Sequence, residues 1–499
     1  MIPLDPIPRP IDHLAVRGQP DAPALIDRTG AMSFAELDAA TGAVARALLD
    51  RGLVAGDRVA TWLPKTRLAC IMPLAAARAG LVHVPVNPAL RHGQVAHILH
   101  DSGATLLVTQ PMRAATLERD DVPHDCPVIQ EDALPRNGAA LPLSSGDPEK
   151  LAAILYTSGS TGRPKGVMLS HANLWLGAIA VAHYLRLAPE DRVLAVLPLS
   201  FDYGQNQLFS TWAAGGAVMP LDYLAPRDVV KAVARLGATT LAGVPPLWTQ
   251  LLEIEWEDAG NNLRRLTNSG GALTPRMVRN LRSHFPQADL YAMYGLTEAF
   301  RSTWLDPALI DANPDAIGRA IPFADVMVVR PDGQRAIAGE PGELVHAGPL
   351  VAHGYWRDAE RTAARFRPAP DFAAAGGTAV WSGDTVVEGE DGLLRFVGRD
   401  DEMIKTAGNR LSPQEIEEAI LSGEEAREAV VVGVPDDRLG QAIVAVVAGD
   451  PMQEQALLRR LRTDLPSFMQ PARYVWHATL PRNANGKLDR AAIRAEVLR

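Results

Sequence analysis

The chain has few cysteines, no concentrated block of basic residues and no long uninterrupted apolar segment. Its 499 residues include only Cys70 and Cys126, which are too few for a disulfide framework and lack the spacing of metal ligands. A formal net charge of -9, without Lys/Arg runs among aromatic residues, argues against a nucleic-acid-binding protein. The longest apolar region, residues 68–86, contains Arg78 and His83, so we expect a buried core element and no transmembrane segment.

The chain does contain enough apolar sequence for more than one folding unit. Apolar residues make up 47% and charged residues 21% of the sequence, which is typical of globular domains. Near the N-terminus, a helix with a capping box at Ser33 precedes strand-like runs at 56–63 and 82–86. This alternation of helices and strands predicts parallel sheets covered on both faces. Residues 1–6 are proline-rich and acidic, unlike a signal peptide, so we expect a cytoplasmic protein.

A dense cluster of phosphate-binding groups lies between two apolar runs. Residues 151–155 predict a buried strand and residues 168–182 could form a helix. Between them, residues 155–167 read Leu-Tyr-Thr-Ser-Gly-Ser-Thr-Gly-Arg-Pro-Lys-Gly-Val. Glycines let the backbone approach an anion, hydroxyls donate to phosphate oxygens and lysine adds charge. Although the spacing is not that of a Walker loop, we predict a phosphate-binding loop. Its candidate residues are Thr157, Ser158, Gly159, Ser160, Thr161 and Lys165.

Two downstream motifs carry groups suited to a nucleotide. Residues 290–298 read Leu-Tyr-Ala-Met-Tyr-Gly-Leu-Thr-Glu; an aromatic ring can stack on a purine, a hydroxyl can hold a phosphate oxygen and a carboxylate can bind magnesium. Residues 381–384, Trp-Ser-Gly-Asp, end a strand in a carboxylate that could accept hydrogen bonds from two ribose hydroxyls. A lone Gly-Asp is usually only a turn. Residues 354–356, Gly-Tyr-Trp, are assigned a structural role.

In this order and at these distances, the motifs resemble those of adenylate-forming (AMP-binding) enzymes, which include acyl-CoA synthetases, peptide-synthetase adenylation domains and luciferases. Residues 294–303 also resemble acyl-CoA ligases associated with exosortase systems. The resemblance implies an α/β fold with a large AMP-binding domain of parallel-rich sheets covered by helices, residues 1–398, that includes a small β subdomain. A hinge at 399–402 and a small mobile α+β domain at 403–499 would follow.

The resemblance also implies a role for each motif residue. Magnesium would bind to Glu298, the ATP triphosphate to the 157–165 loop, and the reacting oxygens to Lys487; Lys487, Thr297 and Glu298 would be catalytic. The small domain would rotate about Asp401 and then present residues 405–410 to a thiol. Further nucleotide contacts would come from Gly270, Gly271, Ala272, Tyr294, Gly295, Asp384 and Arg399.

The acyl pocket would begin at Phe201-Asp202-Tyr203-Gly204. This run resembles the Phe-Asp-x-Ser of amino-acid-adenylating domains, whose aspartate holds the substrate amine. Alternatively, Asp202 pairs with a protein cation or caps a helix. Arg301 could bind a second acidic group of the substrate, neutralise Asp202 or lie on the surface, and we favour neutralisation. The expected pocket residues are Phe201, Asp202, Tyr203, Asn206, Leu247, Met293, Arg301 and Ser302, whose mixture of polar and bulky groups favours a small or medium polar acid.

The resemblance implies a two-step reaction. A substrate carboxylate attacks the α-phosphorus of ATP to give acyl-AMP and pyrophosphate, and a pantetheine thiol then displaces AMP. Residues 405–413, Lys-Thr-Ala-Gly-Asn-Arg-Leu-Ser-Pro, resemble coenzyme-A ligases, so we expect an AMP-forming acyl-CoA synthetase. The alternative, favoured by Asp202, is a stand-alone amino-acid-adenylating enzyme that loads the phosphopantetheine of a separate carrier protein. The final lysine, Lys487, disfavours a catalytically silent nucleotide-binding relative.

Overall fold

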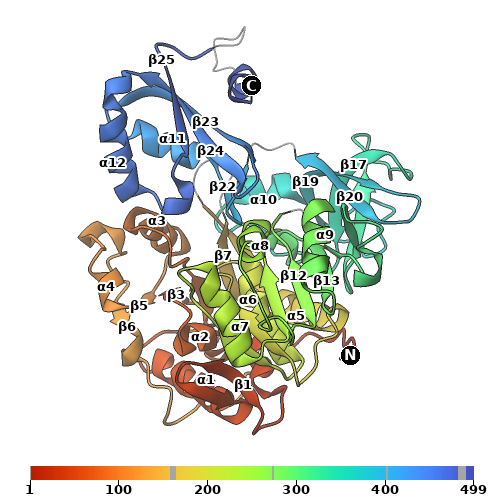
Figure 1. The fold of residues 1–499 in the computed structure, drawn as a ribbon. Coiled ribbons are helices and arrows are strands. Elements are labelled where there is room, and N and C mark those ends of the chain that lie inside the picture. The colour runs from red at the N-terminus through yellow and green to blue at the C-terminus, as the bar shows by residue number, and fades with distance from the viewer. Residues whose placement is uncertain are drawn as a thin grey trace.

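Two sheets and their covering helices form the large N-terminal body in the computed structural model, which describes residues 2–157, 164–271, 273, 275–399, 403–481 and 490–498 (Figure 1). The smaller sheet has the order β6-β5-β3-β4-β7-β8. Its strands are parallel except for the antiparallel pair β7 and β8. The strands are β3 (Arg58–Trp62), β4 (Val82–Pro85), β5 (Leu106–Thr109), β6 (Val128–Gln130), β7 (Leu151–Thr157) and β8 (Lys165–Ser170).

The larger sheet has a parallel part and an antiparallel part. Its order is β16-β17-β19-β20-β15-β14-β13-β12-β11-β9-β10-β1-β2, with β18 beside β19. The parallel part contains β1 (Pro23–Asp27), β9 (Arg192–Ala195), β10 (Ala217–Pro220), β11 (Thr240–Gly243), β12 (Arg265–Asn268) and β13 (Asp289–Tyr294). The antiparallel strands are β2 (Gly30–Ser33), β14 (Thr303–Trp304), β15 (Ala316–Ala320), β16 (Asp325–Val329), β17 (Pro341–Ala347), β18 (Phe366–Pro368), β19 (Thr378–Glu388) and β20 (Leu394–Arg399). Strands β17, β19 and β20 form the β-rich region at the right of Figure 1.

Helices α5 and α6 are the most deeply buried helices of this body. Thirteen of the fourteen residues of α5 and all twelve of α6 are buried, as expected of helices covered on every side. Their side chains join a core cluster that also contains residues of both sheets. The helices of the body are α1 (Phe34–Leu49), α2 (Arg67–Arg78), α3 (His92–Ser102), α4 (Pro111–Ala114), α5 (His171–Tyr184), α6 (Asp202–Ala213), α7 (Pro226–Leu236), α8 (Pro245–Leu252), α9 (Pro275–His284) and α10 (Ala359–Arg365).

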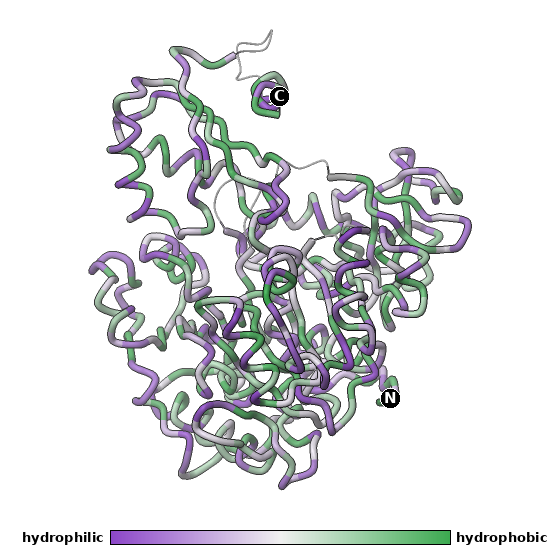
Figure 2. The backbone as a smooth tube through the Cα atoms, viewed as in Figure 1, coloured by the Kyte–Doolittle hydropathy of each residue, from purple (hydrophilic) through white to green (hydrophobic). Residues whose placement is uncertain are grey.

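A smaller lobe follows, drawn in blue at the top of Figure 1. Its strands are β21 (Ile404–Thr406), β22 (Asn409–Leu411), β23 (Ala426–Asp436), β24 (Gly440–Gly449) and β25 (Arg473–His477), and its helices are α11 (Pro413–Leu421), α12 (Glu454–Asp464) and α13 (Arg490–Val497). Strands β23 and β24 are apolar along most of their length (Figure 2) and pack against α11 and α12 in a core of their own. Short 3-10 helices are η1 (Ile11–Val16), η2 (Arg119–Asp121), η3 (Glu131–Ala133), η4 (Thr297–Ala299), η5 (Pro307–Leu309), η6 (Pro451–Gln453) and η7 (Ser467–Met469).

The predicted α/β class, with a smaller α+β unit at the C-terminal side, is confirmed. The predicted capping box is present, because Ser33 and Glu36 bond reciprocally at the start of α1. One local prediction was wrong: residues 168–170 belong to β8, and the helix begins only at His171. Val167 pairs across the ladder with Leu155, so the apolar residues after the loop complete a hairpin before Ser170 caps α5.

The small lobe contacts the large body through the turn between β21 and β22 and through α11. Gln94 of α3 donates from Nε2 to Glu415 Oε1 at 2.9 Å and to Met469 Sδ at 3.2 Å. Burial raises the pKa of Glu415 to about 7. Gly408 has φ +78°, and a Cβ there would lie 2.6 Å from Val244 Cγ2. A glycine is therefore required where the hairpin approaches the body.

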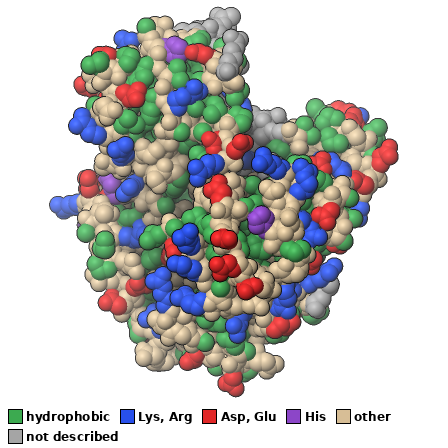
Figure 3. Space-filling model, in the orientation of Figure 1, with side chains coloured by type: hydrophobic (Ala, Val, Ile, Leu, Met, Phe, Trp, Pro, Cys, Tyr) green, Lys and Arg blue, Asp and Glu red, His purple; other side chains and the backbone are tan. Residues whose placement is uncertain are grey.

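The chain carries charges of both signs over its surface. On the face in Figure 3, Lys and Arg are interspersed with Asp and Glu. Within the described ranges, no helix combines the length and the apolar character needed to cross a bilayer. The predicted domain limits, 1–398, 399–402 and 403–499, remain a prediction; β20 ends at Arg399 and β21 begins at Ile404.

Candidate active site

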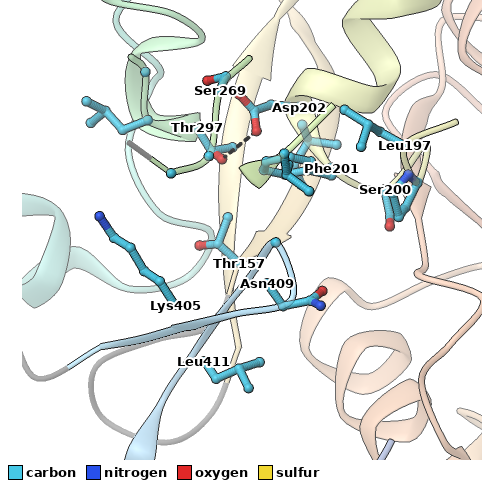
Figure 4. Close-up of a pocket in the computed structure, with 18 of the residues that line it drawn as sticks. Thr157, Leu197, Ser200, Phe201, Asp202, Ser269, Thr297, Lys405, Asn409 and Leu411 are labelled. Atoms are coloured by element: carbon cyan, nitrogen blue, oxygen red, sulfur yellow. Dashed lines mark hydrogen bonds between the residues drawn. The ribbon is translucent and has the colours of Figure 1, made fainter. Parts of the chain in front are cut away.

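A cavity of about 740 Å³ lies where the carboxyl ends of the parallel strands face the small lobe. Loops at the carboxyl ends of parallel strands are the usual ligand sites of open α/β sheets. The lining comes from β7, the loop after β9, the ends of β12 and β13, η4, β19 and the β21–β22 hairpin. Figure 4 shows Asp202, Ser269 and Thr297 at one end of this cavity and Lys405, Asn409 and Leu411 at the other.

A lysine, a tyrosine and a carboxylate form one hydrogen-bonded group in the cavity lining. Lys165 Nζ donates to Tyr355 Oη at 2.7 Å and lies 3.1 Å from Glu298 Oε1. Tyr355 Oη in turn donates to the same Glu298 oxygen at 2.7 Å. The lysine and glutamate side chains are 17% and 8% exposed. The sequence places these three residues far apart, and the fold brings a cation and an anion together at fixed positions.

This group fits a bound triphosphate and magnesium. Magnesium usually takes one or two protein carboxylates and completes its shell with phosphate oxygens and water. Glu298 lines the cavity and supplies one carboxylate, and the part of the chain that the structure describes has no cluster of three or more His, Cys, Asp or Glu that would hold a metal by itself. Glu298 would therefore hold the ion together with the phosphates, whose charge the ion neutralises.

Tyr355 is a residue that the sequence interpretation missed, because Gly354-Tyr355-Trp356 was assigned a structural role. Its backbone N–H donates to Thr362 Oγ1 at 2.9 Å, and its ring lies 4.1 Å from Lys165 Nζ. Gly354 has φ +113°, and a Cβ there would lie 2.6 Å from Thr362 Cγ2. The only sequence signal is a glycine before an aromatic residue, which is too common to indicate a role.

The predicted nucleotide residues also meet in this cavity. Tyr294, at the end of β13, donates from Oη to Asp384 Oδ2 at 2.5 Å, and Asp384 lies on β19. The backbone N–H of Asp384 donates to Ser382 Oγ at 3.0 Å, which fixes the start of the carboxylate side chain. Gly270 has φ +78° at the turn after β12. The predicted residues that line the cavity are Thr157, Lys165, Gly270, Gly271, Tyr294, Gly295, Thr297, Glu298 and Asp384.

Several predicted residues lie outside the described part of the chain, so their roles remain predictions. They are Ser158, Gly159, Ser160, Thr161, Ala272, Asp401 and Lys487, together with the side chain of Arg399.

The acyl end contains a buried aspartate and a buried arginine. Asp202 is the first residue of α6 and is 5% exposed, and its Oδ1 accepts a hydrogen bond from Thr297 Oγ1 at 3.4 Å (Figure 4). Burial raises the pKa of Asp202, and the charge of Arg301 opposes that rise. Arg301 Nη2 lies 3.9 Å from Asp202 Oδ2, and the arginine is 2% exposed. The surface position considered for Arg301 is therefore excluded.

Half of the expected acyl-pocket residues line the cavity. These are Phe201, Asp202, Met293 and Arg301. The other four, Tyr203, Asn206, Leu247 and Ser302, are buried but are not part of its lining. Tyr203 Oη hydrogen-bonds with Thr267 Oγ1 at 2.6 Å, and Ser302 Oγ with His346 Nδ1 at 2.9 Å. Their assignment to the acyl pocket therefore stays a prediction, and a motif read along the chain does not show which side chains face a cavity.

The β21–β22 hairpin closes the cavity from the side of the small lobe. Its lining residues are Lys405, Ala407, Gly408, Asn409 and Leu411. A second cavity of about 360 Å³ continues from there between the body and the small lobe. It shares Gly270, Gly271, Phe396, Lys405 and Gly408 with the first. Three of these shared residues are glycines, which leave more space at the junction of the two cavities than larger side chains would.

Comparison with known proteins finds matches over most of the chain. The family model described as "AMP-binding enzyme" matches residues 13–356, and the model of its C-terminal domain matches residues 415–487. A linear gramicidin synthase of Brevibacillus parabrevis is 31% identical over 487 residues, covering 96% of this chain. The chain spans only 6% of the length of that protein.

Solved structures of similar proteins cover 98% of this chain. O-succinylbenzoate CoA synthetase of Bacillus subtilis, bound to a product analogue, is 25% identical and superposes with a TM-score of 0.87 over 98% of both chains. The same enzyme in complex with its acyl-adenylate intermediate superposes with a TM-score of 0.71 over 98% of both chains. An amide bond synthetase from Marinactinospora thermotolerans gives 0.86 at 27% identity, covering 98% of this chain and 99% of that one.

Proposed function

Since this chain belongs to the AMP-binding enzyme family, we propose that it adenylates a carboxylic acid with ATP and transfers the acyl group to a pantetheine thiol, that of coenzyme A. The observation that carries the proposal is the shared cavity, in which Lys165, Glu298 and Asp384 face a hairpin of the small lobe. The position of the hairpin connects the adenylating groups with an access route for the second substrate.

In the first step, a carboxylate oxygen of the acid bonds to the α-phosphorus of ATP while the bond to pyrophosphate breaks. Lys165 and the predicted loop residues hold the triphosphate, and Asp384 holds the ribose. Such chemistry depends mainly on positioning and charge neutralisation. Lys487 would contact the reacting oxygens, as the family resemblance implies. The cation at Lys165 is already held by Tyr355 and Glu298, so little reorganisation is needed at that position.

In the second step, a thiolate bonds to the acyl carbon, AMP leaves, and the thioester is released. Two observations support a pantetheine thiol arriving between the lobes. The second cavity joins the first at Gly408 and Lys405, and its lining includes residues of β23 and β24. The chain also superposes better on the synthetase with its product analogue, at a TM-score of 0.87, than on its acyl-adenylate complex, at 0.71.

A second candidate is the loading of an amino acid onto a separate carrier protein. Its support is the buried Asp202 in the cavity lining and the similarity to a linear gramicidin synthase. In this alternative the carboxylate would hold the substrate ammonium group. The similarity to an amide bond synthetase adds an amine as an alternative acceptor in place of a thiol.

The test separates activation from transfer. ATP–pyrophosphate exchange over fatty, aryl and amino acids identifies the activated acid, and mass spectrometry then detects the acyl group on coenzyme A, on carrier proteins or on an added amine. We expect activity with acids that lack an amine and product on coenzyme A. Exchange limited to amino acids, and lost in Asp202→Ala, would select carrier loading. Normal acyl-AMP formation in Lys487→Ala would contradict the role of that lysine.

A further inference from the structure

The acyl end of the cavity contains a guanidinium whose hydrogen-bonding capacity is largely unused. Arg301 lines the cavity, yet among the described residues its guanidinium has one hydrogen bond, donated from Nη1 to Ser269 Oγ at 2.6 Å. Nε and Nη2 have no hydrogen-bond partner among the described residues, because the 3.9 Å separation from Asp202 is too long for one. Buried polar groups are nearly always paired, so each exception requires an explanation.

The backbone next to this arginine is strained, and close packing holds it in that conformation. Phe300, immediately before it, has φ +60°, which is unusual for a residue with a side chain and tends to persist at functional sites. The Phe300 ring occupies space that Gly177 of α5 leaves open, since a Cβ at Gly177 would lie 2.2 Å from Phe300 Cδ1. Gly295 similarly allows close approach, because a Cβ there would lie 2.9 Å from Arg301 Cα. Gly177 thus positions the residue before the arginine, and Gly295 lets the arginine itself pack closely.

The surroundings of the guanidinium are polar but electrically balanced. Its Cζ lies 4.8 Å from the centre of the Tyr203 ring, and Asp202 supplies one opposing charge. Asn268, next to Ser269, also lines the cavity, and its Oδ1 has no hydrogen-bond partner in the described ranges. A second carboxylate here would leave a net negative charge beside Asp202, and a buried uncompensated charge is costly. An uncharged oxygen adds an acceptor without changing the balance.

We propose that Arg301 selects an acid that carries an uncharged oxygen substituent, a hydroxyl or oxo group, on its acyl chain. The substituent accepts hydrogen bonds from Arg301 Nε or Nη2, and a hydroxyl can also donate to Asn268 Oδ1. The inference rests on the proposed adenylation and names its substrate class. A site that binds a substrate oxygen discriminates against the analogue without it, because its own buried groups then lose their partner.

The test uses acids in matched pairs that differ by one oxygen, such as pentanoate with 4-hydroxypentanoate and 4-oxopentanoate, and benzoate with 4-hydroxybenzoate. Pyrophosphate release gives kcat/KM for each acid, and succinate and alanine serve as charged comparisons. Arg301→Met removes the donors at similar length. Arg330→Met is the matched control, because Arg330 pairs with Asp332 and Glu340 outside the cavity.

We expect at least one oxygenated acid to exceed its unsubstituted partner by about tenfold or more in kcat/KM. Arg301→Met should abolish that preference, mainly through loss on the oxygenated member, and Arg330→Met should keep it. An equal loss on both members would indicate a purely structural role and overturn the inference, as would preference for unsubstituted acids, succinate or alanine in the wild-type enzyme. If Arg301→Met does not fold, two measurements test the inference instead: the wild-type ratios of kcat/KM within each acid pair, and the same ratios in Arg301→Lys. If none of the acids in the panel stimulates pyrophosphate release, the proposed adenylation itself would be contradicted.

Discussion

Replacing Gly408 with alanine should impair thioester formation while sparing acyl-adenylate formation. In the present arrangement, the new Cβ would lie 2.6 Å from Val244 Cγ2 and 3.2 Å from Val244 Cβ. Overpacking of this kind costs about 1–3 kcal/mol. The positive φ of +78° adds about 1–2 kcal/mol, but that strain is internal to the hairpin and persists wherever the lobe moves. Only the collision with Val244 biases the lobe away from the body.

A bias of about 1–3 kcal/mol corresponds to roughly 5- to 150-fold, at about 1.4 kcal/mol per factor of ten. We therefore expect thioester formation from preformed acyl-AMP to fall within that range, with ATP–pyrophosphate exchange changed much less. Val244→Ala should restore much of the loss in the Gly408→Ala background because it removes the colliding methyl groups. Gly52→Ala is the matched control for the backbone strain, since its φ is +88°, its added Cβ would meet no atom within 4 Å, and it lines neither cavity. Equal loss of both half-reactions, or no rescue, would refute the reasoning.

Three further predictions concern the site and the lobe contact. Tyr355→Phe removes the hydroxyl that joins the cation to the carboxylate, so kcat/KM for ATP should fall about tenfold in steady-state assays, and an unchanged value would contradict the assignment. Burial raises the pKa of Glu415 to about 7 in this arrangement, against the opposing effect of the hydrogen bond from Gln94. Docking of the lobe should therefore weaken as pH rises from about 4.5 through 7, and Glu415→Gln should remove that dependence in protease-sensitivity assays of the lobe contact. Gly177→Ala should destabilise the protein by about 1–3 kcal/mol in urea unfolding, because its Cβ would collide with Phe300; a neutral effect would show that the ring can move.

Local sequence patterns were sufficient for much of the fold. The capping box at Ser33 and the alternation of helices and strands depend on neighbouring residues, and the structure confirms both. The strand at 168–170 was missed because its assignment requires the partner Leu155, which lies across a loop. Periodicity describes one segment at a time, so a hairpin that interrupts an apolar run escapes it.

The nucleotide and acyl ends of the site differed in how well sequence could describe them. Tyr294, Glu298 and Asp384 stand in compact motifs, and they meet in one cavity. Tyr355 was missed because its role depends on contact with residues 190 and 57 positions away. Of the expected pocket positions on α6, Asp202 lines the cavity whereas Tyr203 and Asn206 do not. Every residue of that helix is buried, so burial alone could not indicate which face lines the cavity.

The charge balance at Asp202 bears on the choice between the two candidate functions. Asp202 and Arg301 lie 3.9 Å apart in a buried site, and with both side chains ionised the pair is neutral. An ammonium group held by Asp202 would leave a net positive charge, whereas an uncharged oxygen held by Arg301 would not. Uncompensated buried charge is costly unless a further partner balances it, and amino-acid loading would need such a partner on the substrate. The pair therefore favours an acid without an amine. This preference depends on Arg301, which is not part of the aspartate motif that suggested an amino acid.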